Sequence, residues 1–96
     1  MELEELLKKH REQILATAQK YGAYDVRIFG SVVRCEARDD SDIDFLVNLE
    51  TGRSLLDLAR LLRELQSLLG CKVDIVTEAG LRPRIRPDVL REARPL

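Results

Sequence analysis

The segment from Val26 to Val47 decides the fold, and it reads VRIFGSVVRCEARDDSDIDFLV. Up to Phe29 it alternates polar and apolar residues, which predicts a short strand that runs into a tight turn at Gly30. From Ile43 to Val47 the run is nearly all apolar, as is typical of a strand covered on both faces. The segment therefore predicts two strands joined by a polar connection, in which residues 31–37 could form one or two helical turns.

Two aspartates mark the start of the second strand. Residues two apart in a strand point the same way, so Asp42 and Asp44 project from one face while Ile43 and Phe45 are buried on the other. Carboxylates held close together repel each other, and a divalent cation between them keeps both ionised. Oxygen ligands of this kind suit Mg²⁺, which binds a few carboxylates together with phosphate oxygens and water. The pair therefore predicts a magnesium site.

A Gly-Ser turn precedes this pair, and a strand followed by such a turn and a short helix can bind phosphate. Gly30 lets a ligand approach the backbone closely because it has no Cβ. Amides at the start of the following helix carry partial positive charge, and Ser31 adds a hydroxyl donor. Arg34 lies one helical turn further on, where it reaches either a phosphate or an acidic residue of the loop. Gly30 and Ser31, with Arg34 as a candidate, are therefore expected to bind a nucleotide.

A third carboxylate, Asp74, lies inside the apolar strand predicted for residues 72–76. An unpaired carboxylate in such a place is costly. If this strand lies beside the one that carries Asp42 and Asp44, Asp74 reaches the same cation and could accept a proton as a general base. Three carboxylates with two metal ions would clamp an in-line displacement at phosphorus. The alternative is a structural ion pair of Asp74 with Lys72 or an arginine.

The remaining elements complete an α+β pattern. Residues 2–20 show a helical apolar period that stops at Gly22, and Pro87 suits the first turn of a short final helix through Ala93. Between them, a capping box at Ser54 opens a helix that closes at Gly70. Its apolar stripe is expected to consist of Leu55, Leu58, Ala59, Leu62, Leu65 and Leu69, with Leu56 and Leu61 outside it. This order predicts a two-layer α+β fold, a small mixed β-sheet with flanking helices.

Length and composition bound the function. The 96 residues are enough for one domain over residues 1–96 and too few for two. A net charge of −1 and 4% aromatic residues argue against direct nucleic-acid binding. The N-terminus lacks a signal peptide, and no stretch approaches the ~20 apolar residues of a membrane span, so we expect a cytoplasmic protein without a membrane partner. The C-terminal arginines suit either a solvated tail or a surface for an acidic partner or a triphosphate: Arg82, Arg84, Arg86, Arg91 and Arg94.

The order of these motifs resembles the signature of the DNA polymerase β-type nucleotidyltransferase superfamily: Gly-Ser, then Asp-x-Asp, then a later third aspartate. At this length the chain is most similar to the minimal nucleotidyltransferases, called MNT proteins. The resemblance covers residues 26–76 by motif, and its one departure is Cys35-Glu36, where many relatives have a glycine. It implies the polymerase β-type fold, with the nucleotide on the Gly-Ser turn and metal binding and catalysis on Asp42, Asp44 and Asp74.

The resemblance also implies an activity and a partner. MNT proteins are commonly paired with HEPN proteins in toxin-antitoxin systems, and the antitoxin members transfer AMP from ATP to a tyrosine of the HEPN ribonuclease, which silences it. The resemblance therefore implies a Mg²⁺-dependent protein adenylyltransferase that uses ATP and two Mg²⁺ ions and acts as the antitoxin of a HEPN toxin by AMPylation. Whether it works as a homo- or hetero-oligomer stays open.

Two other functions stay open as well. The chain could modify a small molecule or an RNA end, although larger relatives do this with domains for which it has no room. It could also be an antitoxin that occludes its partner without catalysis. A calcium-binding loop over residues 40–51 is excluded, because Phe45 stands where the sharp turn needs glycine and Thr51 stands where the bidentate glutamate belongs.

Overall fold

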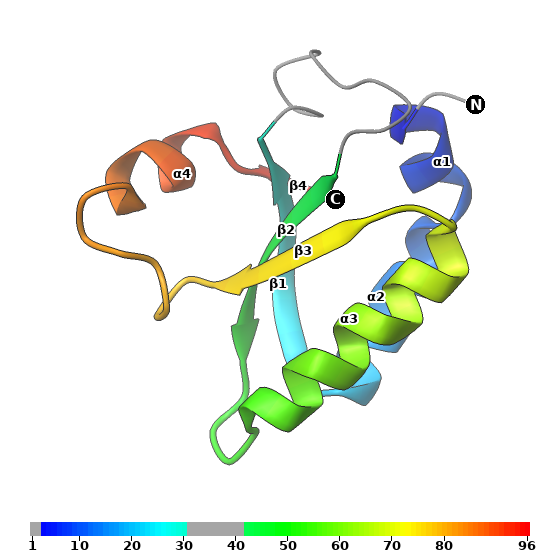
Figure 1. Ribbon diagram of the computed structural model, residues 1–96, viewed down its shortest axis with the longest axis horizontal. Coiled ribbons are helices and arrows are strands. Elements are labelled where there is room, and N and C mark those ends of the chain that lie inside the picture. The colour runs from blue at the N-terminus through cyan, green and yellow to red at the C-terminus, as the bar shows by residue number, and fades with distance from the viewer. Residues whose placement is uncertain (1–2, 31–41) are drawn as a thin grey trace.

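Residues 3–30 and 42–96 are described in the computed structural model, and they form helices packed on a four-stranded mixed sheet (Figure 1). The elements follow the chain in the order α1 (Leu3–Lys9), α2 (Arg11–Lys20), β1 (Ala23–Phe29), β2 (Ile43–Leu49), α3 (Leu55–Leu69), β3 (Val73–Thr77), α4 (Arg86–Glu92) and β4 (Arg94–Pro95). This confirms the predicted α+β fold. The helical turns predicted for residues 31–37 lie outside the described residues.

The sheet has the strand order β3-β2-β1-β4. β1 pairs with β2 and with β4 in antiparallel orientation, whereas β2 and β3 are parallel. A parallel pair needs a crossover connection, and the 15-residue helix α3 supplies it. The topology therefore places β2, with its nearly continuous apolar sequence, inside the sheet and β3 beside it.

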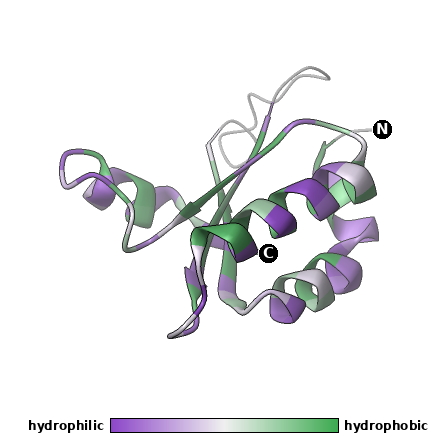
Figure 2. Cartoon of the chain, turned by 60° about the horizontal axis from the view of Figure 1, so that its bottom comes forward, coloured by the Kyte–Doolittle hydropathy of each residue, from purple (hydrophilic) through white to green (hydrophobic). Residues whose placement is uncertain are grey.

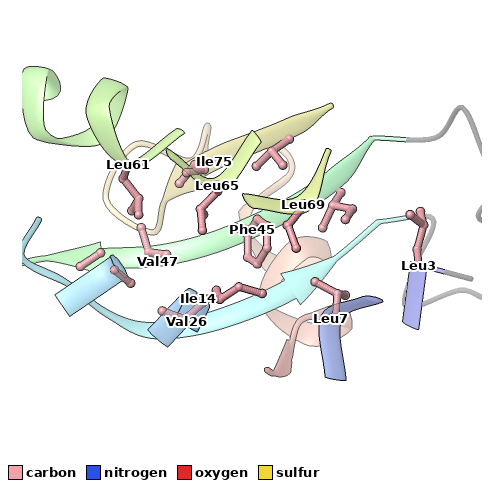
Figure 3. Close-up of a cluster of buried hydrophobic side chains, with 14 residues drawn as sticks. Leu3, Leu7, Ile14, Val26, Phe45, Val47, Leu61, Leu65, Leu69 and Ile75 are labelled. Carbon is pink, nitrogen blue, oxygen red and sulfur yellow. The ribbon is translucent and has the colours of Figure 1, made fainter. Parts of the chain in front are cut away.

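Helices α1, α2 and α3 cover one face of the sheet. α2 packs on β1, α3 packs on β3, and the two helices contact each other. Leu61, Leu65 and Leu69 of α3 lie against Phe45 and Val47 of β2 in the main core cluster (Figure 3). Hydropathy follows this arrangement, because the strands are mostly hydrophobic while the helices carry hydrophilic residues on their outer sides (Figure 2).

The opposite face of the sheet is covered in its middle by α4. Leu46, which points away from Phe45, is fully buried in a second cluster with Leu81 and Val89. Burying such a side chain contributes about 1.5–3 kcal/mol. The second cluster explains why β2 is apolar on both faces after Asp44, as its sequence predicted. No helix in the described ranges is long and apolar enough to cross a membrane.

The predicted single helix over residues 2–20 is wrong, because the chain forms two helices separated at His10. The backbone of His10 has φ −104° and ψ 11°, outside the helical region, and its imidazole Nδ1 lies 2.7 Å from Gln13 Oε1. Leu7 before the break and Ile14 after it both enter the core. The apolar period thus continues through the break, so the period gives no sign of it.

The ends of α3 are as predicted, but its buried stripe is not. Ser54 forms the capping box with Asp57, and Gly70 ends the helix in the left-handed conformation. Leu61 is 1% exposed and belongs to the buried set, whereas Leu55 is 80% exposed. α3 carries more leucines than the core buries. The periodicity of these leucines therefore predicted the wrong buried side for the first turn of the helix.

β1 contains a bulge at Asp25, whose φ is +52°. Tyr24 pairs with Asn48 but Arg27 pairs with Leu46, so two residues of β1 lie opposite one residue of β2. The bulge changes the phase of the strand. Beyond it, Arg27 faces the α4 side of the sheet.

The C-terminal segment contains one element that was not predicted. The final helix spans Arg86–Glu92, with Pro87 in its first turn as predicted and Ala93 as its C-cap. The last residues then form β4, a two-residue strand in which Arg94 pairs with Ile28 and Pro95 with Arg27. Nothing in the periodicity indicates this strand, because two residues are too few to show an alternation.

Candidate nucleotide and metal site

Two of the three predicted aspartates, Asp44 and Asp74, lie side by side on one face of the sheet, and the third directly precedes β2. β2 and β3 are neighbours, and Asp44 stands directly beside Asp74 in the parallel register. Asp42 directly precedes β2 and is exposed. On the opposite face, Ile43 and Phe45 are fully buried, as the alternation of the strand requires. The strand of Asp74 therefore lies beside β2, as the predicted shared cation site requires.

Gly30 brings the end of β1 against this face. Phe29 pairs with Asp44, and the next residue, Gly30, has φ +79°. A Cβ placed on Gly30 would lie 2.3 Å from Asp44 Oδ2. Glycine is favoured here because its φ would strain any other residue, and an added Cβ would also force the Asp44 carboxylate to move. The turn and the aspartate strand thus meet at van der Waals distance.

The chemistry of this face fits a hard divalent cation. Its donors are carboxylate oxygens, and within residues 3–30 and 42–96 no basic side chain forms an ion pair with Asp42 or Asp74. No three acidic, histidine or cysteine side chains in the described part of the chain converge closely enough to hold a metal ion. The backbone therefore brings the aspartates close to one another, but their side chains do not converge in the geometry of a bound metal ion.

Two predicted nucleotide-binding residues, Ser31 and Arg34, lie outside the described residues, as does Cys35.

Cys71 lies beside the acidic face. Burial, and secondarily the negative charge of Asp42, raise the pKa of the Cys71 thiol. A raised pKa keeps the thiol protonated at neutral pH, so Cys71 is not an activated nucleophile.

One residue at the site was not found from sequence. The backbone N–H of Gly30 donates a hydrogen bond to Glu92 Oε1 at 3.1 Å, and Glu92 is the last residue of α4. The two residues are 62 positions apart. The pairing of β4 with β1 brings Glu92 close to Gly30, and no pattern in the sequence indicates that pairing.

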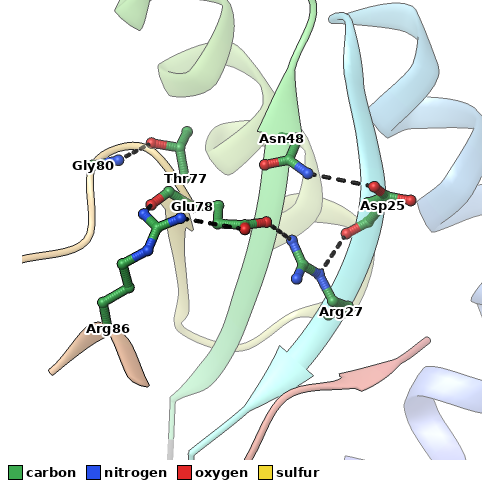
Figure 4. Close-up of polar contacts among 7 residues, drawn as sticks. All are labelled: Asp25, Arg27, Asn48, Thr77, Glu78, Gly80 and Arg86. Carbon is green, nitrogen blue, oxygen red and sulfur yellow. Dashed lines mark hydrogen bonds and ion pairs between the residues drawn. The ribbon is translucent and has the colours of Figure 1, made fainter. Parts of the chain in front are cut away.

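A second polar group, which we call the Glu78 cluster, lies on the same side of the sheet and consists of Asp25, Arg27, Asn48, Glu78 and Arg86 (Figure 4). Arg27 Nη2 lies 2.9 Å from Glu78 Oε2, and Arg86 donates to the Glu78 carbonyl at 2.7 Å. Hydrogen bonding from Arg27 is the main cause that lowers the pKa of Glu78, with Asn48 and the charges of both arginines adding to it. The cluster is a neutralised network that ties β1, β3 and α4 together.

The C-terminal arginines have different surroundings. Arg86 belongs to the Glu78 cluster, and Arg91 forms an exposed ion pair with Asp88 at 3.6 Å. Arg82 and Arg84 are exposed. The choice between a solvated tail and a binding surface therefore concerns Arg82, Arg84 and Arg94, since Arg86 has a structural role.

Comparison with known proteins agrees with this geometry. Residues 7–96 match the family model described as nucleotidyltransferase domain. The protein adenylyltransferase MntA of Thermococcus cleftensis is 40% identical over 95% of this chain and 89% of its own length. A relative from Methanocaldococcus jannaschii, also assigned as a protein adenylyltransferase, is 41% identical over 86% of this chain and 89% of its own length.

Solved structures give the same result. One that is assigned as a minimal nucleotidyltransferase is 57% identical, covers all of this chain and 97% of its own, and superposes with a TM-score of 0.88. A toxin-antitoxin crystal structure with AMP-PNP shares the fold at a TM-score of 0.75 and 20% identity, over 88% of this chain and 69% of its own. The chain therefore belongs to the nucleotidyltransferase domain family, among the minimal nucleotidyltransferases that include proteins named MntA.

Proposed function

We propose that this chain is a single-domain, Mg²⁺-dependent protein adenylyltransferase that transfers AMP from ATP to a tyrosine hydroxyl of a HEPN-type toxin and so acts as its antitoxin. The observation that carries the proposal is the register that sets Asp44 beside Asp74, with Gly30 packed against Asp44. The names of the relatives support the reaction, because two relatives at 40% and 41% identity carry protein adenylyltransferase in their names.

Each residue of the site has a proposed role. Asp42 and Asp44 would hold magnesium, Asp74 would be the third ligand, and Gly30, Ser31 and Arg34 would hold the phosphates. When bound, Mg²⁺ neutralises the phosphate charge and orients the oxygens around phosphorus. The acceptor oxygen would attack the α-phosphorus of ATP, pyrophosphate would leave with the electrons of the broken P–O bond, and Asp74 would take the hydroxyl proton.

Solved structures of the same fold bear on the acceptor. The described residues form one four-stranded sheet, in which Asp44 lies beside Asp74 on one face. The MntA-HpeT toxin-antitoxin, which shares this fold, was solved as a tyrosine-to-alanine mutant and also as a mutant in which two aspartates two positions apart became glutamates. Asp42 and Asp44 have this spacing here. We infer that a partner chain supplies the acceptor hydroxyl.

The test is the intact mass of the protein encoded by the neighbouring gene, after incubation with this chain, ATP and Mg²⁺. We expect a gain of one or more AMP units, which disappears with Asp42→Ala/Asp44→Ala and when Mg²⁺ is replaced by a chelator. If the proteins bind but no mass is gained, the chain is an occluding antitoxin or uses another acceptor. Efficient transfer to a small molecule or an RNA end by the isolated chain would contradict a protein substrate.

A further inference from the structure

Glu92 places a carboxylate on an amide that belongs to the proposed phosphate turn. Its Oε1 accepts the hydrogen bond of the Gly30 N–H at 3.1 Å, and the contact is partly buried. Hydrogen bonds from a backbone N–H to an ionised carboxylate are stronger than those to a neutral acceptor. The amide that would be offered to a nucleotide phosphate is therefore already occupied by an anionic group of the same chain.

The fold fixes Glu92 in this place. β4 pairs with β1 through Ile28 and Arg94, and Leu96 N–H donates to the Val26 carbonyl at 3.2 Å. Continuing this antiparallel register by two residues places Glu92 opposite Gly30. Because Glu92 is still helical, the strand pairing stops before it, and its side chain supplies the acceptor that a strand carbonyl would otherwise provide.

A phosphate and the Glu92 carboxylate cannot occupy the Gly30 amide together. Both are anions that accept hydrogen bonds, and a triphosphate near Glu92 and the aspartates of β2 would meet repulsion from every carboxylate left in place. Because the contact is partly buried, water and salt screen this repulsion less than they would at an exposed site. Nucleotide binding at this turn therefore requires the Glu92 side chain to move off the amide.

We propose that Glu92 is a positioning residue that holds the Gly30 amide in place of a nucleotide phosphate and is displaced when the nucleotide binds. The inference rests on the proposed function, because it takes the Gly30 turn to be the phosphate site. Glu92 thereby lowers the affinity for the triphosphate and links nucleotide binding to the end of α4. A purely structural role predicts the opposite result, since loss of Glu92 would then loosen the turn and weaken binding.

The experiment is calorimetric titration of the full chain with a non-hydrolysable ATP analogue and Mg²⁺, and separately with inorganic tripolyphosphate. We expect Glu92→Gln, which has the same shape without the charge, to lower Kd about tenfold, as expected for one lost competing charged hydrogen bond. Glu92→Ala should bind at least as tightly as Glu92→Gln. Adenosine, which lacks phosphate, should bind alike to all variants.

Asp88→Asn is the matched control, because it removes one negative charge from the same helix at an exposed ion pair. Its Kd should stay close to that of the unchanged chain. The amide resonance of Gly30, one of five glycines, gives an independent readout: it should shift in Glu92→Gln and shift again with tripolyphosphate.

The outcomes separate the two proposals. If the unchanged chain binds the Mg²⁺ nucleotide but Glu92→Gln binds no more tightly, the inference about Glu92 is overturned and the proposed function stands. Weaker binding by Glu92→Ala also overturns it, in favour of a structural role. If no variant binds nucleotide, both are overturned.

Discussion

The side of the sheet that α4 partly covers has two charged regions built from similar side chains in opposite ways. In the Glu78 cluster, one carboxylate faces two arginines and an asparagine, and Arg27 holds it at 2.9 Å. At the other end Asp44 and Asp74 lie side by side, Asp42 directly precedes β2, and no ion pair from a described residue neutralises Asp42 or Asp74. Between the two regions, Leu46 packs with Leu81 and with Val89 of α4 in the second hydrophobic cluster.

The difference separates charge used for structure from charge kept for a ligand. A carboxylate with its own arginine contributes to folding but has little left to offer a cation. Asp42 and Asp74 form no ion pair with a described residue, and carboxylates held close together repel each other until a bound cation neutralises them. We therefore expect substitutions at the Glu78 cluster to act on stability, and substitutions at the acidic end to act on the reaction.

The largest expected effect is on transfer activity. Asp44→Asn should slow AMP transfer by about 10³-fold or more, because metal stabilisation contributes several kcal/mol to such a displacement. Glu78→Gln should leave the rate within about twofold at a temperature where both variants are folded, since Glu78 stabilises the fold rather than the reaction. The measurement is the initial rate of mass gain on the partner. Equal losses in both variants would contradict the division between the two regions.

The next effect concerns the packing of the turn on the acidic end. Gly30→Ala should destabilise the chain by about 1–3 kcal/mol, mainly from left-handed backbone strain, with a smaller part from moving the Asp44 carboxylate away from the added Cβ. Gly52→Ala is the control, because its φ of +92° is also unfavourable but nothing lies within 4 Å of the added Cβ. It should cost only about 1–2 kcal/mol. Urea unfolding measures both.

A double variant sharpens this test. In an Asp44→Ala background the carboxylate that the new methyl group would meet is gone. Gly30→Ala should then cost about as much as Gly52→Ala. If the cost stays the same with and without Asp44, the contact between turn and aspartate does not determine the packing there.

The smallest effect is a pH dependence at the Glu78 cluster. The pKa of Glu78 lies below its ordinary value of 4.5 because of Arg27, so the pair stabilises the folded state fully above that value. This stability is lost as the pH falls through the lowered pKa. Glu78→Gln should therefore be less stable at neutral pH and lose less stability on acidification. Urea midpoints from about pH 6 down to about pH 3 measure the slope, and parallel slopes would contradict this role.

Much of the fold follows from local sequence signals. α3 begins at a capping box and ends at glycine, and the nearly continuous apolar run of β2 matches its burial on both faces. The split at His10 could not be predicted, because the apolar period continues through it and only one backbone conformation changes. The error in the buried stripe of α3 has another cause: its leucines exceed what the core can bury, as exposed Leu55 shows.

The candidate site was predictable in so far as it depends on strand geometry. The spacing of Asp42 and Asp44 predicts a shared face, whereas Asp74 lies beside Asp44 only through the adjacency of β2 and β3. The contact of Glu92 with Gly30 and the contacts of the Glu78 cluster could not be predicted from the sequence. The Gly30–Glu92 and Arg27–Glu78 contacts join residues 62 and 51 positions apart, and neither residue of a pair has a pattern that indicates its partner.

The bulge at Asp25 has a consequence for how this small domain tolerates change. It divides β1 into two halves whose side chains alternate in different phase: Ala23 enters the core before it, while Arg27 and Gly30 are positioned after it. A slipped register normally inverts a whole strand. We expect a one-residue deletion between α2 and the bulge to remove the bulge rather than to shift the register that pairs Phe29 with Asp44. The length of the helical half could then change by one residue while the acidic face keeps its alignment.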